Sequence, residues 1–406
     1  MSDASAKGME RPARATLLLA GLAVLTLYSF LRGQSVFLQP AGTIYYVVDY
    51  SNGFVRRALI GQLYMLFYTR AEAAQAWATT LVMHRLTSFL VLAGVMCWFW
   101  AEVWQRRQFA ADRLILLYAL FAVSQFYPTL AATTTYLDSY VFLLMLAAFA
   151  LAARGKYVLA TCLVAIGPLI HELVVVLSVP LLLMLIWRHG LRGLRRPDVA
   201  VLCLTPFVVA LLAFHFETTH AVALQMQRAP IPPDWRAEMA QWQFGNTFRG
   251  DFAMMLHKLS QHPIRAIATM LAFLLPTIAM LAVAVPAMKR RSAALLTLAA
   301  LSPLGTLLVA WDLSRLVVIT QFAAILSILF MATSGENRVP AASMAPTSRR
   351  AGWGFVAALA MLPLIYGYFD HAVIFGNGVM ENMPGLSRPM LKVDAVLRAT
   401  IGGSGT

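Results

Sequence analysis

Charged residues are scarce in this chain. Only 12% of its 406 residues are Asp, Glu, Lys or Arg, whereas 60% are hydrophobic and the mean hydropathy is +0.70. Soluble domains contain about 25% charged residues and roughly 45–50% apolar residues. So few polar side chains cannot cover a water-exposed surface, which excludes a soluble globule, a disordered chain, a coiled coil and a repeat solenoid. The composition predicts an all-α, polytopic transmembrane helical bundle.

Cysteine and the common catalytic motifs are also scarce or missing. Cys97, Cys162 and Cys203 all lie within apolar segments, so we expect small core residues and no disulfide framework. The sequence has no GxGxxG, Walker, CxxC, HExxH or GxSxG motif. We therefore predict no certain cofactor and no metal-ligand set, although a divalent metal stays an open option.

Eleven apolar segments are candidate membrane spans, because a span needs roughly 20 apolar residues. The fifth and sixth are short and are separated only by His171 and Glu172, so they form either two spans or one broken, re-entrant pair. The segments are about 15–33, 86–104, 113–129, 136–153, 157–170, 173–188, 199–216, 264–288, 293–311, 316–332 and 353–369.

Basic residues gather on one side of this topology. With the N-terminus in the cytoplasm, every short cytoplasmic connection is basic, whereas the short outer connections hold Arg315 alone. This asymmetry follows the positive-inside rule and accounts for the net charge of +14, so we expect no nucleic-acid partner. Acidic residues gather on the outer side, with 12 of the 18, and we expect any chemistry there.

We expect a single integral membrane domain over residues 1–406. Within its first outer loop, 34–85, the apolar run from Ala58 to Tyr68 is too short to span and predicts a helix lying at the interface. The second long outer loop, 217–263, combines prolines with aromatic residues and predicts a partly helical cap on the membrane surface. The remaining connections are a cytoplasmic linker at 333–351 and an outer tail at 370–406.

The first candidate site follows Asp49 in the first outer loop. Arg56 and Arg57 can hold a phosphate through bidentate contacts, Asn52 can bind substrate, and Asp49 can act as a general base on a hydroxyl. The alternative is structural: the two arginines anchor an interfacial helix to lipid phosphates, and Asp49 is a solvated loop acid.

Two further candidates lie at the ends of predicted spans. Asp138 begins the fourth span, where it is either a functional carboxylate favoured by the helix dipole or part of a helix cap. The adjacent His171 and Glu172 are costly to bury between two apolar helices, which favours a catalytic or substrate-orienting function over a polar surface turn. By contrast, His84 at the mouth of the second span is expected to be simply interfacial.

The last candidate is the pair Asp312 and Arg315 at the mouth of the tenth span. The two residues are three apart and share a helix face, so they form either a structural ion pair or a phosphate-binding site. Across the whole sequence the centres of the spans carry almost no charge, which disfavours an ion-coupled transporter or channel. A rim of charged residues below long loops favours an enzyme that acts on a lipid headgroup.

This arrangement resembles the polytopic glycosyltransferases of the GT-C superfamily. Asp49 and Asp138 correspond to the acidic residues that this family keeps in its first two outer loops. The strings DYSNGFVRRALIG, IHE and DLSR are also similar to a branch of bacterial inner-membrane proteins. The resemblance covers roughly the first 190 residues best and implies a location in the bacterial inner membrane, with the active site on the periplasmic side.

The resemblance also implies the partners, namely a polyprenyl-phosphate sugar donor and a glycan or glycolipid acceptor. Asp49 is followed by Tyr50 where protein-modifying members have paired acids, and a large soluble C-terminal domain is missing, which favours a glycolipid or polysaccharide acceptor. The implied reaction inverts the anomeric carbon, with Asp49 as base, Arg56, Arg57 and Arg315 on the phosphate, and Asp138, His171 and Glu172 orienting the acceptor. The alternatives are a polysaccharide polymerase or ligase, a lipid-linked oligosaccharide flippase or transporter, and a non-catalytic scaffold.

Overall fold

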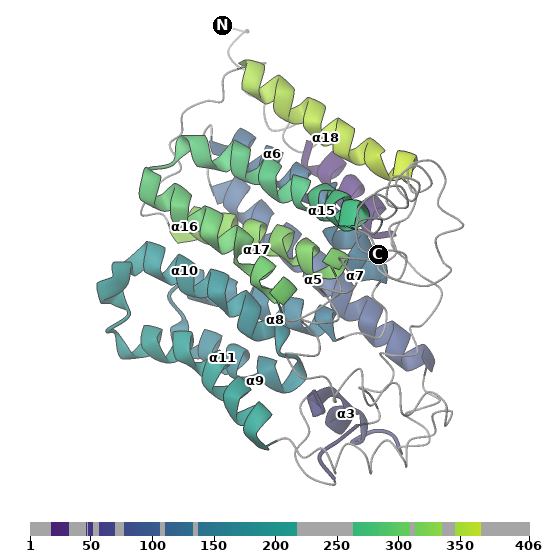
Figure 1. Cartoon of the computed structure of the whole chain (residues 1–406), viewed down its shortest axis with the longest axis vertical. Helices are drawn as coiled ribbons and strands as arrows, with labels where there is room; N and C mark the ends of the chain where they lie inside the picture. The colour runs from purple at the N-terminus through teal and green to yellow at the C-terminus, as the bar shows by residue number, and fades with distance from the viewer. Residues whose placement is uncertain are drawn as a thin grey trace, which may run out of the picture.

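The chain folds into a bundle of long helices. The computed structural model describes residues 18–31, 46, 48–51, 57–69, 77–105, 110–132, 137–216, 263–308, 313–334 and 346–366. These residues contain helices and turns but no strand, which confirms the all-α class. Figure 1 shows the helices running side by side, with α18 (Pro346–Tyr366) on one edge and α9 (Tyr157–Ile170) and α11 (Pro197–Phe216) towards the other.

The other helices follow the predicted apolar segments. The first predicted segment contains a helix over Leu18–Leu31. The remaining elements are α3 (Leu59–Tyr64), α5 (Trp77–Gln105), α6 (Ala110–Ala122), α7 (Phe126–Ala132), α8 (Asp138–Ala153), α10 (Leu173–Gly193), α15 (Pro263–Ala284), η3 (Val285–Ala287), α16 (Arg290–Leu301), η4 (Ser302–Leu308) and α17 (Leu313–Ser334).

Among the described residues, three helices are long and apolar enough to cross a membrane, over Thr79–Trp104, Leu173–Gly193 and Val317–Ser334. This supports the prediction of a membrane protein, but it does not confirm eleven spans. Five further apolar stretches, two of them within the longer helices α11 and α15, have 10–17 described residues each. Helices also end inside two of the predicted segments. The third segment is divided between α6 and α7, and the ninth is divided between α16 and the 3-10 helix η4. A hydropathy run does not show where a helix is interrupted.

Helix α17 forms the centre of the bundle and is the most buried of the three candidate spans. Its Phe322 ring stacks on Phe126 of α7 with centroids 4.9 Å apart, and Phe142 of α8 packs edge-on against both rings. Polar side chains of α17 also pair within the core, where Gln321 donates to the carbonyl of Phe273 at 2.6 Å. These contacts hold α17 against α7, α8 and α15.

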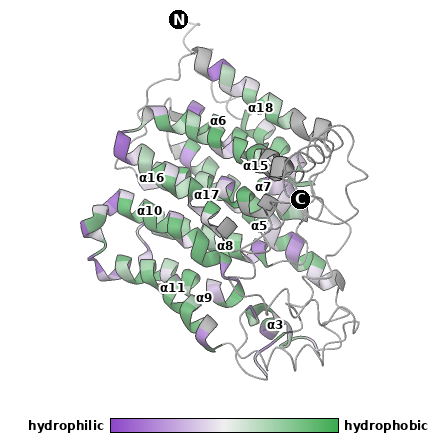
Figure 2. Ribbon diagram, viewed as in Figure 1, coloured by the Kyte–Doolittle hydropathy of each residue, from purple (hydrophilic) through white to green (hydrophobic). Residues whose placement is uncertain are grey.

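Short turns divide the charged residues between two ends of the bundle. Helices α8 and α9 pack together and are joined by residues 154–156, so the beginning of α8 and the end of α9 lie at the same end. We call this the Asp138 end; it also holds His171 and Glu172. The opposite end, the Arg154 end, holds the last turn of α10. Figure 2 shows hydrophilic residues at the ends of α10, α11 and α16 and apolar residues along their lengths.

The cysteine prediction was wrong about burial. Cys97 and Cys162 are exposed and Cys203 is partly exposed, and all three are free thiols. In a membrane bundle the outward faces of helices are as apolar as the core, because they contact lipid and not water. An apolar neighbourhood in the sequence therefore does not show that a residue is buried.

Candidate functional site

An ion pair between Arg57 and Glu172 is the central contact of the candidate site. Arg57 Nε donates to Glu172 Oε2 at 2.7 Å, and Arg57 Nη2 donates to Glu172 Oε1. The two residues are 115 positions apart, and their side chains are 13% and 30% exposed. The pair therefore joins the first predicted outer loop to the turn between α9 and α10. A bidentate pair of this kind fixes the plane of the guanidinium group.

The backbone of Arg57 is strained. Its φ is +62°, and it is the one non-glycine residue with a positive φ among those that the structure describes. The left-handed region costs a residue with a Cβ atom roughly 1–2 kcal/mol. Such strain persists where other contacts hold the residue in place, and it is concentrated at functional sites. At Arg57 the contact with Glu172 supplies this restraint.

His171 and Glu172 form the turn between α9 and α10, at the position that the sequence predicts. His171 has an extended backbone and ends α9, while Glu172 is the N-cap of α10 and makes no side-chain capping bond. The amide N–H of Leu173 donates to His171 Nδ1 at 3.1 Å, so this nitrogen is an acceptor and the ring proton is assigned to Nε2. Nδ1 also lies 3.6 Å from Glu172 Oε2.

Close packing of α9 on α10 sets the position of this turn. A Cβ atom placed on Gly167 would lie 2.5 Å from Cγ2 of Val174, a distance that real contacts do not reach. Glycine therefore lets the last turn of α9 approach the first turn of α10. His171 is buried at the end of this tight hairpin. His171 is therefore not a surface residue, whereas the Glu172 side chain is partly exposed.

Asp49 lies in a loop that is tied to the short helix α3. Its side chain is buried, and its Oδ1 accepts the amide N–H of Ser51 at 2.8 Å. The next residue, Tyr50, donates its amide N–H to the side chain of Gln62 in α3 at 3.0 Å. The alternative of a solvated loop acid is therefore wrong for Asp49. The prediction of a helix within Ala58–Tyr68 is confirmed by α3.

A cluster of tyrosines connects this loop with the beginning of α8. The ring of Tyr46 packs edge-on against Tyr64 of α3, with centroids 4.8 Å apart, and neighbours Tyr140 of α8. Asp49 follows Tyr46 by three residues, and Asp138 precedes Tyr140 by two residues. Burial raises the pKa of Tyr46 well above its ordinary value and raises the pKa of Tyr50 to about 12. Both phenols thus stay protonated at neutral pH.

Asp138 is the buried first residue of α8. The N-cap is Leu137, and no side chain caps the helix, so a simple capping function is wrong for Asp138. A carboxylate in the first turn is stabilised by the helix dipole.

His84 corrects a sequence prediction and enlarges the polar network at this end. The prediction of an interfacial residue was wrong, because α5 begins at Trp77 and His84 is buried inside it. Its Nε2 lies 3.2 Å from the carbonyl oxygen of Leu130, and its Nδ1 lies 3.4 Å from Ser139 Oγ. Ser139 follows Asp138, so His84 reaches the beginning of α8.

Three of the predicted site residues lie outside the described part of the chain. These are Asn52, Arg56 and Asp312. Arg315 lies in the first turn of α17, but its side chain is not among those that the structure describes. The far end of α17 contacts α5 where Thr333 accepts from Trp98 and donates to Glu102, so α17 begins at the Asp138 end.

The structure therefore brings Arg57, His171 and Glu172 into contact and places Asp49 and Asp138 at the same end of the bundle. Among the residues that it describes, no group of three or more His, Cys, Asp or Glu side chains could hold a metal ion. Comparison of the chain with protein-family models, with curated proteins and with solved structures finds no match. The functional argument thus depends on the site itself.

Proposed function

We propose that this protein is an inverting membrane glycosyltransferase of the GT-C type. It moves a sugar from a polyprenyl-phosphate donor to a glycolipid or polysaccharide acceptor, in a bacterial inner membrane and on the periplasmic side. The observation that carries the proposal is the strained Arg57, held in a bidentate pair by Glu172 beside a buried His171. A guanidinium that fits a carboxylate in this way also fits a phosphate.

The phosphate of the donor would replace Glu172 on Arg57. The Glu172 carboxylate contacts the guanidinium edge that a phosphate would use. Binding of the donor would transfer Arg57 to the phosphate, where its charge stabilises the leaving group. Glu172 and His171 would then be released to orient the acceptor hydroxyl. Arg56 and Arg315 are proposed to complete the phosphate site.

Asp49 is proposed as the general base. The acceptor oxygen attacks the anomeric carbon, the bond from that carbon to the phosphate oxygen breaks, and the acceptor proton goes to the Asp49 carboxylate. The products are an inverted glycoside and a polyprenyl phosphate. Burial of Asp49 supports this function, because a base in a buried site is shielded from bulk water.

The location of the buried ionisable groups favours the enzyme over a transporter. Within the described helices the buried imidazole and carboxylate groups are His84, Glu102 and Asp138, and each lies in the first or last third of its helix. A transporter would place such groups near the middle of the membrane, where broken helices form a central cavity. A polysaccharide polymerase or ligase would share the proposed reaction and differ in its acceptor.

Substitution of Asp49 by Asn tests the proposal. We expect Asp49→Asn to abolish sugar transfer from a panel of polyprenyl-phosphate sugars in proteoliposomes, with expression and thermal stability close to wild type. The matched control is Asp198→Asn, which changes a carboxylate at the Arg154 end and should leave transfer unchanged. Wild-type transfer by Asp49→Asn would remove Asp49 as the base.

A further inference from the structure

A basic surface covers the Arg154 end of the bundle, opposite the proposed active site. It consists of exposed cations in the α8–α9 turn, in the connection between α10 and α11, and at the start of α16. These cations are Arg154, Lys156, Arg192, Arg195, Arg196, Lys289, Arg290 and Arg291. The carboxylate in these segments is Asp198, which pairs with Arg196 at 2.9 Å. Most of the positive charge therefore has no acidic neighbour within these segments.

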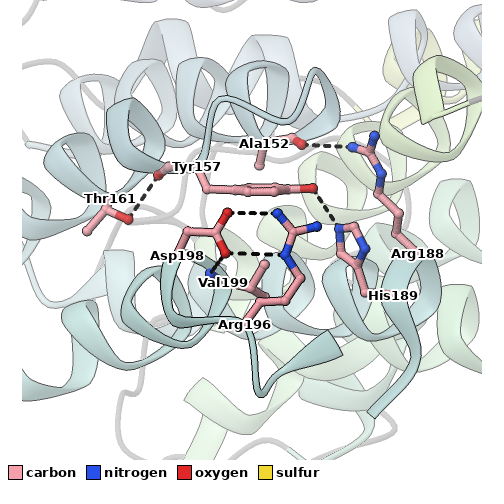
Figure 3. Close-up of polar contacts among 8 residues, drawn as sticks. All are labelled: Ala152, Tyr157, Thr161, Arg188, His189, Arg196, Asp198 and Val199. Atoms are coloured by element: carbon pink, nitrogen blue, oxygen red, sulfur yellow. Dashed lines mark hydrogen bonds and ion pairs between the residues drawn. The ribbon is translucent and has the colours of Figure 1, made fainter. Parts of the chain in front are cut away.

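Side-chain contacts hold the first two segments together. Arg188 Nη1 donates to the carbonyl oxygens of Ala152 and Ala153 at 3.1 and 2.8 Å. The hydroxyl of Tyr157 lies 2.6 Å from Nε2 of His189. Figure 3 shows the contacts of Arg188 with Ala152 and of Tyr157 with His189. The Arg196 guanidinium lies beside the Tyr157 ring, 5.6 Å from its centroid. The end of α10 is thus fixed to the α8–α9 turn.

The third segment is joined to the end of α10 in the same way. The indole N–H of Trp187 donates to Ser292 Oγ at 3.0 Å, and Arg291 Nη2 donates to the carbonyl oxygen of Ile186 at 3.4 Å. The beginning of α16 and the end of α10 therefore form one continuous surface. Hydrogen bonds already fix the segments that carry these cations, so ligand binding does not have to order these segments.

Exposed apolar side chains border these cations. Leu191 is 71% exposed and adjoins Arg192, and Val158 is 70% exposed and lies two residues after Lys156. Trp104, close to the end of α5, is also exposed. Tryptophan and a boundary between apolar and basic residues are typical of the level where acyl chains meet headgroups. A soluble polyanion would make no contact with these apolar side chains.

We propose that the part of this surface between α10 and α16 binds the headgroup of an anionic phospholipid. Lys289 and Arg290 at the start of α16, with Arg192 at the end of α10, would hold the phosphate. Lys289 and Arg290 do not stabilise α16, because positive charge at the start of a helix opposes its dipole and α16 has no acidic residue in its first turn. Their side chains are exposed, and within the described part of the chain they form no salt bridge.

Native mass spectrometry of the full-length protein in detergent micelles tests this site. The probes are phosphatidylglycerol and phosphatidylcholine with equal acyl chains. We expect the wild type to retain phosphatidylglycerol preferentially, and the double variant Lys289→Gln/Arg290→Gln to lose affinity for it on the order of tenfold. Phosphatidylcholine binding should not change.

A second double variant distinguishes a site from diffuse attraction. Arg349→Gln/Arg350→Gln removes the same charge from α18 and should change phosphatidylglycerol affinity less than about twofold. The proposal is overturned if the wild type does not prefer phosphatidylglycerol, or if this control loses as much affinity as the first variant. Displacement of the lipid by millimolar inorganic phosphate would also overturn it, because the site would then bind free anions.

Discussion

Replacing Glu172 by Gln should have opposite effects on stability and on phosphate binding. The substitution removes the charge that holds Arg57 but keeps the size of the side chain and one acceptor oxygen. In the free protein Arg57 is strained at φ +62° and is held by two hydrogen bonds from its guanidinium group. If a phosphate replaces Glu172 on Arg57, the carboxylate competes with the donor for the same cation.

The magnitude follows from the exposure of the pair. Hydrogen bonds to charged groups contribute roughly 1.5–3 kcal/mol each, and pairs exposed to solvent contribute less. Because Glu172 is 30% exposed and Gln keeps one hydrogen bond, we expect Glu172→Gln to lower the free energy of unfolding by about 1 kcal/mol. In Glu172→Gln a phosphate displaces an interaction that is weaker by this about 1 kcal/mol, so the affinity for the phosphate should rise about fivefold.

Calorimetric titration with farnesyl phosphate, a short polyprenyl phosphate, measures this affinity for the full chain in detergent micelles. Thermal unfolding measures the stability of the same samples. Arg57→Gly is the complementary variant: glycine accepts a positive φ, so the backbone strain disappears while phosphate binding should be lost. Asp198→Asn breaks the Arg196 pair at the Arg154 end and should leave the farnesyl phosphate affinity unchanged. Lower affinity in Glu172→Gln would refute the competition between carboxylate and phosphate.

Two further predictions concern packing and pH. Gly167→Ala should lower the free energy of unfolding by about 1–3 kcal/mol because its Cβ would overlap Val174, whereas Gly354→Ala has open space and should be neutral or stabilising in the same thermal-unfolding assay. Burial raises the pKa of Tyr50 from 10.0 to about 12, so the unfolded chain releases this proton first and stability should fall between pH 10 and 12. Denaturant unfolding across this range should show a smaller fall in Tyr50→Phe, and an equal fall in both proteins would contradict the assignment to Tyr50.

The positions of most helices could be predicted from the sequence because apolar runs end at polar residues. The predicted boundary between the fifth and sixth segments is the pair His171 and Glu172. In the structure α9 ends directly before this pair and α10 begins directly after it. The prediction failed at α5, which begins nine residues before the expected 86. The cost of burying the His84 ring there is offset by hydrogen bonds to Leu130 and Ser139, which lie far along the chain.

The site residues could be predicted as candidates but not as a constellation. The first outer loop and the His171–Glu172 pair each drew attention because charge is costly near a membrane. The contact between Arg57 and Glu172 joins residues 115 positions apart, so it depends on how α3 packs against α9. Similarly, the positive φ of Arg57 has no signal in the sequence, since non-glycine residues rarely adopt it.

The most direct test of the central claim is mass spectrometry of the lipids that copurify with the full-length protein, before and after it is incubated with polyprenyl-phosphate sugars. The account predicts a bound polyprenyl phosphate or polyprenyl-phosphate sugar in the wild type, and its loss in Arg57→Gly. Ordinary phospholipids alone in both proteins, even after the donors are added, would contradict a glycosyltransferase and would make the Arg57–Glu172 pair a structural contact.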